Sequence, residues 1–319
     1  MMQFLSSYPW RYYLKTFFRK GRTVRGALLV KEDRVSILSP VGRKLVFSGG
    51  LRELKGAPSL TNSIIAGSDT AFRRKALANR AVNHLFEWIF VVDIPDVQIH
   101  QIDSHRYGST RDLTSRGVTE LVPSALKADL ADWELVNSKL EPIEQDMTPV
   151  CILWGLPKSV IKDLEGWSRQ LGSIVSAILP LPLVLLEQSI TLSPTGFHVV
   201  LTTNHTVIAL SQDGEIRLIT RVDPIKRLGA SQIDATMGSF GDTFPEIAQL
   251  PARFISLDLS SVELANEVKD FSVAVVSTSP SEFLDLEEII QGYRVAPIEA
   301  FALYRALCLV PPNPHHQNP

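Results

Sequence analysis

Residues 150–189 read VCILWGLPKSVIKDLEGWSRQLGSIVSAILPLPLVLLEQS and hold the clearest secondary-structure pattern of the chain. Cys151–Trp154 is a short apolar run, typical of a strand that is covered on both faces. Pro157 suits the first turn of a helix, and Gly172 suits the position just after its end. The apolar run Ser173–Ile178 predicts a second strand, and a further helix with prolines at its start follows. This order predicts a right-handed βαβ unit.

The sequence before this stretch predicts mostly strands. Alternating or apolar runs bounded by turn residues indicate strands at 24–30, 34–39, 41–47 and 97–102, a hairpin over 62–75 and a helix over 78–89. Residues 103–147 are polar and acid-rich, and a hairpin with insertions would fit them.

The sequence after it predicts three strands in succession, at 197–203, 206–211 and 215–222. Asp213-Gly214 favours a type I′ turn between the last two, because such a turn needs positive φ at both central residues. The remaining pattern predicts a helix over 225–237, a glycine-rich loop at 238–241, a short helix at 245–250, a strand at 254–259, a helix capped by Ser260-Ser261, a strand at 271–277, and helices at 282–291 and 297–309.

Periodicity alone predicts an α/β protein with mixed sheets. Three strands, a helix, a strand, a helix and a strand is the order of a ribonuclease-H-like domain. It is clear over 197–291, and a version with insertions fits 24–188. Two such lobes make an actin-like fold, so we expect a basic aromatic segment at 1–23, a first lobe with an inserted subdomain at 24–190, a second lobe at 191–310 and a disordered tail at 311–319.

The composition is that of a soluble globular protein, with 319 residues, 45% of them hydrophobic and 21% charged. The longest apolar stretch, Ile174–Leu186, contains two prolines and is shorter than the ~20 residues of a spanning helix. The N-terminal residues lack the features of a signal peptide, so secretion is not expected. Cys151 and Cys308 form no CxxC pair, which favours reduced thiols in the cytosol.

Positive charge is concentrated at the N-terminal end. Residues 1–55 hold twelve Lys or Arg against three acids, whereas the net charge of the whole chain is −2. Aromatic and basic residues alternate there, which suits an anionic membrane surface or an acidic partner; equally, the rings could pack on the protein while the cations stay solvated. Nucleic acid is not expected, because no binding motif accompanies the charge. The candidate residues are Trp10, Arg11, Tyr12, Tyr13, Lys15, Phe17, Phe18, Arg19 and Lys20.

Several pieces of the sequence resemble one family. The central stretch, the hairpin and arginine-bearing strand Ser63–Arg74 and the three strands of Gly196–Val222 are similar to the actin-like pilus-assembly protein PilM and the cytoplasmic domain of the type II secretion protein GspL. The resemblance covers about two thirds of the chain. It implies a cytoplasmic protein, peripheral to the inner membrane, that binds the cytoplasmic segment of a bitopic membrane protein and contacts an assembly ATPase.

The residues that would bind nucleotide in an actin-like ATPase are missing. Each lobe of such an enzyme carries Asp-x-Gly in its first hairpin, but residues 31–34 read KEDR and residues 202–205 read TTNH. A late glycine pair is replaced by residues 277–280, which read STSP. We therefore expect no ATP hydrolysis and no cofactor, as the resemblance to the secretion branch also implies.

Other chemistry has little support. The chain has neither a P-loop nor a G-x-S-x-G elbow, and the near pairs His100/His105 and His198/His205 are interpreted as structural or solvated. Arg73 and Arg74 could bind an acidic partner, although arginines at strand ends are usually solvated. The function expected is a non-catalytic scaffold of a pilus or secretion assembly platform. The alternatives are an active phosphotransferase of the same fold and an unrelated α/β interaction domain.

Overall fold

The computed structural model describes residues 24–31, 34–38, 45–50, 86–103, 133–139, 150–170, 173–222, 230–256, 261–277 and 297–309. The predicted hairpin over 62–75, the predicted helix over 282–291 and most of 103–147 lie outside these ranges.

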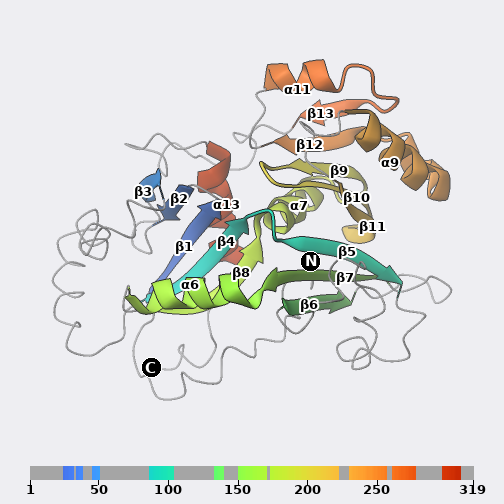
Figure 1. Cartoon of the computed structure of the whole chain (residues 1–319). Helices are drawn as coiled ribbons and strands as arrows, with labels where there is room; N and C mark the ends of the chain where they lie inside the picture. The colour runs from blue at the N-terminus through green and yellow to red at the C-terminus, as the bar shows by residue number, and fades with distance from the viewer. Residues whose placement is uncertain are drawn as a thin grey trace, which may run out of the picture. The chain divides into compact units, whose positions relative to one another are not determined.

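The first sheet has five strands in the order β3-β2-β1-β4-β8 (Figure 1). β1 pairs with β2, and β2 with β3, in antiparallel fashion, whereas β1 with β4 and β4 with β8 are parallel. The strands are β1 (Val24–Lys31), β2 (Arg34–Leu38), β3 (Leu45–Gly50), β4 (Phe86–Asp93) and β8 (Ser173–Pro180).

The central strands of this sheet are buried because their side chains are apolar on both faces. Leu28, Ile89 and Phe90 have no exposed surface. Gly26 lies directly opposite Trp88, and a Cβ atom at residue 26 would lie 2.7 Å from Cε3 of the indole and nearer still to Cζ3. The ring therefore occupies the space that any larger residue at position 26 would need.

The second sheet also has five strands, in the order β11-β10-β9-β12-β13. Its first three strands are antiparallel neighbours, and β12 is parallel to both β9 and β13. If the strands of each sheet are numbered by their order in the chain, both sheets have the same spatial order, 3-2-1-4-5. The strands are β9 (Gly196–Leu201), β10 (Thr206–Gln212), β11 (Glu215–Val222), β12 (Ala252–Ser256) and β13 (Val275–Ser277).

The three-strand meander β9-β10-β11 is confirmed, and so is the turn between its last two strands. Asp213 has φ 53° and Gly214 has φ 83°, as a type I′ turn requires. Phe197 and Ile208 pack with Ile233 and Met237 of helix α9 (Ala230–Thr243) in the core beside this sheet. Alternating apolar side chains thus give the second sheet a hydrophobic core of its own.

Among the described residues, a third sheet contains β5 (Gln98–Asp103), β7 (Val150–Pro157) and β6 (Trp133–Lys139), in the antiparallel order β5-β7-β6. The prediction of a βαβ unit over 150–189 is therefore wrong. β7 and β8 form as predicted, and α6 (Lys158–Gln170) connects them, but they belong to different sheets. An apolar run specifies a buried strand, whereas its pairing partner depends on residues distant in the sequence.

Three further boundaries differ from those predicted. Phe86–Ile89 belongs to β4 and not to a helix, and Gly238–Gly241 lies inside α9 and not in a loop. The last strand of the second sheet is only Val275–Ser277, shorter than predicted. Short apolar runs fit both helix and strand periods, and glycine is tolerated within a helix. Helices α10 (Pro245–Ala248) and α11 (Ser261–Glu267) lie close to their predicted positions.

The described elements fall into two compact units. One contains β1–β4, β8 and α13 (Pro297–Leu309); the other contains β5–β7, β9–β13 and α9–α11, while α6 and α7 (Leu181–Leu192) are divided between them. α13 packs against β1, so the chain returns to the first sheet at its end. The predicted boundary between the two lobes, at residues 190 and 191, stays a prediction. It assigned Pro297–Leu309 to the second lobe and so did not include the return of α13 to the first sheet. In the described part of the chain, no helix is both long and apolar enough to span a membrane.

Candidate functional site

The carboxyl ends of β1 and β4 bring charged residues together. In parallel sheets ligands bind at this edge, because the loops that follow the strands leave room there. Lys31 and Asp93 are register partners at the last positions of the two strands. Asp93 is fully buried, although it is an acidic residue, and it follows the apolar residues of β4. A buried charge at this edge identifies it as the first place to look for function.

Glu299 of α13 forms an ion pair with Lys31. The distance from Nζ to Oε1 is 2.6 Å, and the side chains are 14% and 4% exposed. Glu299 lies in the first turn of α13, which packs against β1, β2 and β4. The ammonium group of Lys31 is therefore neutralised by a carboxylate of the same chain. Of the three residues described at this edge, Asp93 and Glu299 are acidic and Lys31 is basic, a balance that disfavours an anionic ligand.

The turn between β9 and β10 is closed by its own hydrogen bonds. The N–H of Thr202 donates to the carbonyl of His205 at 2.8 Å, and the N–H of His205 donates to Oγ1 of Thr202 at 3.1 Å. Among the described residues, Asp213 is the one non-glycine with positive φ, so this turn lacks the left-handed residue of an anion-binding nest. Both N–H groups are directed into the turn and not toward a ligand.

A chain of hydrogen bonds crosses the second sheet beside α7. His198 Nδ1 lies 2.8 Å from Ser189 Oγ, and His198 Nε2 lies 2.7 Å from Ser211 Oγ. Ser211 Oγ donates its single proton to the carbonyl of Pro194 at 2.8 Å. Ser211 must therefore accept from Nε2–H, which leaves Nδ1 of the neutral imidazole to accept from Ser189.

Burial keeps this imidazole neutral. Desolvation, followed by the positive charge of Arg253, lowers the pKa of His198 from 6.5 to about 3. Arg253 is the register partner of His198 on β12. Ser189, His198 and Ser211 have no exposed surface, so no substrate reaches them. These hydrogen bonds are a structural connection between α7, β9 and β10 and not a catalytic triad.

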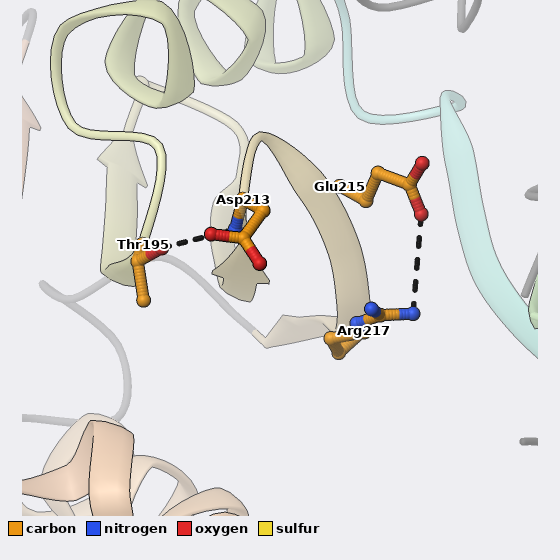
Figure 2. Close-up of polar contacts among 4 residues, drawn as sticks. All are labelled: Thr195, Asp213, Glu215 and Arg217. Carbon is orange, nitrogen blue, oxygen red and sulfur yellow. Dashed lines mark hydrogen bonds and ion pairs between the residues drawn. The ribbon is translucent and has the colours of Figure 1, made fainter. Parts of the chain in front are cut away.

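The same corner of the sheet is fixed by contacts at the β10–β11 turn (Figure 2). The N–H of Asp213 donates to Oγ1 of Thr195 at 2.9 Å. The N–H of Gly214 donates to the carbonyl of Pro194 at 2.8 Å. Arg217 and Glu215 lie 3.9 Å apart, and Glu215 is 42% exposed, so this ion pair contributes little. These contacts hold the loop after α7 against the turn.

Solved structures resemble this chain over most of its length. A chain of the PilM–PilN type IV pilus biogenesis complex matches with TM-score 0.50 and 14% identity, over 92% of this chain and 100% of that one. The same strand order occurs in both five-stranded sheets. The chain has an actin-like fold.

Two other structures give similar comparisons for this actin-like chain. The cytoplasmic domain of EpsL, an inner membrane component of the type II secretion system of Vibrio cholerae, matches with TM-score 0.48 and 10% identity, over 89% of this chain and 94% of that one. A Bacteroides thetaiotaomicron protein with actin-like ATPase fold and unknown function matches with TM-score 0.48 and 14% identity, over 95% and 98%. No family model and no curated protein sequence matches.

Two of the places described above coincide with positions that the sequence analysis singled out. The edge at Lys31 and the turn at 202–205 are the positions where we expected the Asp-x-Gly elements of an ATPase. In the first sheet this position holds the ion pair of Lys31 and Glu299. In the second sheet it holds a turn whose hydrogen bonds are made within the turn itself. The sequence analysis missed Glu299, although a charged residue at the last position of a buried strand, as at Lys31 and Asp93, is a signal that could have indicated the edge.

The other predicted residues are placed as follows. His198 and His205 are fully buried, and His198 is structural, as interpreted. Within the described ranges, no three metal-ligating side chains come together. Ser277, first of the residues in place of the late glycine pair, lies in β13. The candidate binding residues Trp10–Lys20, Arg73 and Arg74, together with Glu32 and Asp33, lie outside the described residues and stay predictions.

Proposed function

We propose that this protein is a non-catalytic, cytoplasmic scaffold at the inner membrane, in an assembly platform of the type IV pilus or type II secretion kind. One observation carries the proposal: the two turns in which an actin-like ATPase would have Asp-x-Gly lack those residues, and polar groups at or beside them bond within the chain. Lys31 is paired with Glu299, and the turn at 202–205 bonds to itself. A fold that keeps its two sheets without a phosphate site leaves its surfaces for docking.

The partner that we propose is the short cytoplasmic segment of a bitopic inner-membrane protein. The likeness to a chain of the PilM–PilN complex supports this choice through the fold. The basic aromatic residues 10–20 support a location next to an anionic membrane, and Arg73 and Arg74 are the candidates for an acidic partner such as a region of an assembly ATPase.

Calorimetric titration with ATP and magnesium tests the absence of a nucleotide site. No binding heat and no release of phosphate are expected, because the Lys31 ammonium is already neutralised and the N–H groups of Thr202 and His205 already have acceptors within their turn. Micromolar affinity would favour the alternative, an active phosphotransferase or ATPase of the same fold.

Copurification tests the scaffold role separately. The tagged full chain, expressed in its own cells and recovered from membranes in mild detergent, is expected to bring down a single-pass inner-membrane protein. Addition of a peptide with that protein's cytoplasmic sequence should release it. Recovery of the chain without any membrane protein, before and after chemical crosslinking, would contradict the proposal.

A further inference from the structure

One outer edge of the second sheet is closed by side chains. On β11, the backbone N–H of Ile219 donates to Oε1 of Gln101 at 2.7 Å, and Nη1 of Arg221 donates to Oε1 of Gln98 at 3.0 Å. Both glutamines belong to β5. β5 therefore already contacts the outer side of β11 at Ile219 and Arg221, which leaves less of this edge for an added strand.

The opposite edge, at β13, has a different character. Among the described residues, no strand pairs with the outer side of Val275–Ser277. The N–H of Ala252 donates to the carbonyl of Ala274 at 2.7 Å, and the register pairs Ala252 with Val275. Because successive backbone groups of a strand alternate in direction, the N–H groups of Val275 and Ser277 are directed away from β12.

A shallow apolar groove of about 380 Å³ adjoins this edge. It is lined mainly by Leu264, Val268, Phe271, Val273 and Val275. Next to it Val276 is 41% exposed, one of the few large hydrophobic side chains that are exposed in the described part of the chain. An apolar surface beside an open strand edge suits an added strand with alternate apolar side chains.

The segment that forms the groove is held in place before any ligand binds. Asp234 of α9 accepts hydrogen bonds from the N–H of Ser272 at 3.0 Å and from its hydroxyl at 2.7 Å. The rings of Phe271 and Phe254 lie 5.8 Å apart. A preformed edge costs less conformational entropy on binding than one that has to be ordered first.

The described residues just before β13 hold more acids than bases. Glu263, Glu267 and Asp270 are exposed acids, and Lys269, which lines the groove, is the one base within residues 261–277. A ligand with Lys or Arg side chains is therefore favoured over an acidic one at this edge.

We propose that an extended, basic segment of a partner polypeptide adds as a sixth strand to the outer edge of β13, with its alternate apolar side chains in the groove lined by Phe271 and Val275. This inference rests on the proposed scaffold function, because the cytoplasmic flank of a bitopic membrane protein is rich in Lys and Arg by the positive-inside rule. It assigns to that partner a binding mode, main-chain pairing, and a place in the fold.

Fluorescence anisotropy with the full chain and synthetic peptides tests this proposal. The probe is a labelled, end-blocked eight-residue peptide of alternating Lys and Val. The Ser277→Pro variant removes one outward N–H, and we expect it to weaken binding by about fivefold to tenfold. Ser277→Ala, which keeps that N–H, should bind like the wild type. Glu267→Lys should weaken binding most at low salt.

Two peptides keep the test decisive even if Ser277→Pro folds poorly. An alternating Glu–Val peptide should bind at least about tenfold more weakly than the Lys–Val peptide, because its charge is reversed. A Lys–Val peptide with alternate backbone N-methyl groups should also lose its affinity, because it cannot pair with the strand. Equal binding of all three peptides, or binding of none, overturns the proposal.

A second copy of this chain is the competing occupant of the edge. Sedimentation velocity over a range of concentrations would then show a dimer of the wild type and a monomer of Ser277→Pro, a result that overturns the partner assignment. The copurification experiment is independent of this edge. If the membrane protein copurifies equally with wild type and Ser277→Pro, the result supports the scaffold function and contradicts the proposed binding site at β13.

Discussion

The hydrogen bonds of His198 show how a polar side chain is accommodated in the core of a sheet. Burial of an imidazole costs least when both ring nitrogens have partners, and for His198 Ser189 and Ser211 supply them from α7 and β10. Both serines occupy positions that an apolar residue would fill in an ordinary core. The requirement for two hydroxyl groups therefore restricts three positions at once.

His198 makes the stability of the protein depend on pH. Its folded pKa of about 3 lies below its usual value of 6.5, so between these values the unfolded chain binds a proton that the folded chain does not. The stabilisation is complete above pH 6.5 and is lost as the pH falls toward 3. Urea unfolding should show a free energy of unfolding about 2 kcal/mol lower at pH 5 than at pH 7 because of this residue.

His198→Gln is the variant that tests this prediction. It is expected to be less stable at pH 7 but to have a flatter dependence on pH, because glutamine does not titrate. His315→Gln, a histidine change near the C-terminus, serves as the control and should keep the slope of the wild type. If the free energy of unfolding fell equally between pH 7 and pH 5 in all three proteins, the pH dependence would come from groups other than His198.

The ion pair of Lys31 and Glu299 gives a second prediction at this scale. Glu299→Gln should lower the free energy of unfolding by about 3 kcal/mol, because it leaves a largely buried ammonium without its carboxylate. The double variant Lys31→Met/Glu299→Leu should lose less than Glu299→Gln alone. Glu215→Gln, at the half-exposed pair with Arg217, should cost less than about 1 kcal/mol in the same urea titrations. A double variant that loses as much stability as Glu299→Gln, or more, would contradict this account.

At the scale of the elements, α9 shows that glycines do not necessarily interrupt a helix. Gly238 and Gly241 both lie within Ala230–Thr243. A Cβ at Gly238 would meet no atom within 4 Å, whereas one at Gly241 would lie 2.9 Å from Cβ of Ala248 in α10. One glycine is thus free to change, and the other permits the close approach of α10.

These two glycines provide a matched pair of variants. Gly238→Ala should raise the free energy of unfolding by about 0.5–1 kcal/mol, because alanine has the higher helix propensity. Gly241→Ala should lower it by about 1–2 kcal/mol, since α10 must shift. Thermal unfolding of both variants checks this. Destabilisation by Gly238→Ala would indicate that the segment is a loop after all.

For the whole molecule, the main feature is the uneven distribution of charge. The N-terminal 55 residues are basic, the residues around β13 are acidic, and the net charge of −2 conceals both. An acidic surface is repelled by an anionic membrane, whereas the basic end is attracted. We therefore expect the basic end of the chain, and not its acidic part, to contact lipid.

Vesicle sedimentation tests the basic end. The full chain is expected to sediment with phosphatidylglycerol vesicles at low ionic strength and to stay in solution at high ionic strength, because salt screens exposed charges. Neutral phosphatidylcholine vesicles are the lipid control. Replacement of Arg11, Lys15, Arg19 and Lys20 by glutamine should abolish the sedimentation. Binding that does not respond to salt would point to hydrophobic insertion instead.

The amino-acid sequence alone determined most of the elements and the fold class. Alternation in β10 and β11, the Asp213-Gly214 turn and the helix Pro297–Leu309 are local patterns, and each was predicted at or near its observed position. The missing Asp-x-Gly residues were also visible, because such motifs are contiguous in the chain. Local order suffices wherever the determining interactions lie within a few residues of each other.

Tertiary structure alone decided the partners of those elements. β7 pairs with β5 and β6 and not with β8, and α13 returns to β1 from the far end of the chain, which brings Glu299 to Lys31. The hydroxyl groups around His198 likewise come from positions up to thirteen residues away from it. These choices depend on which apolar faces bury one another and which polar groups need a partner there, and neither property belongs to any single stretch of sequence.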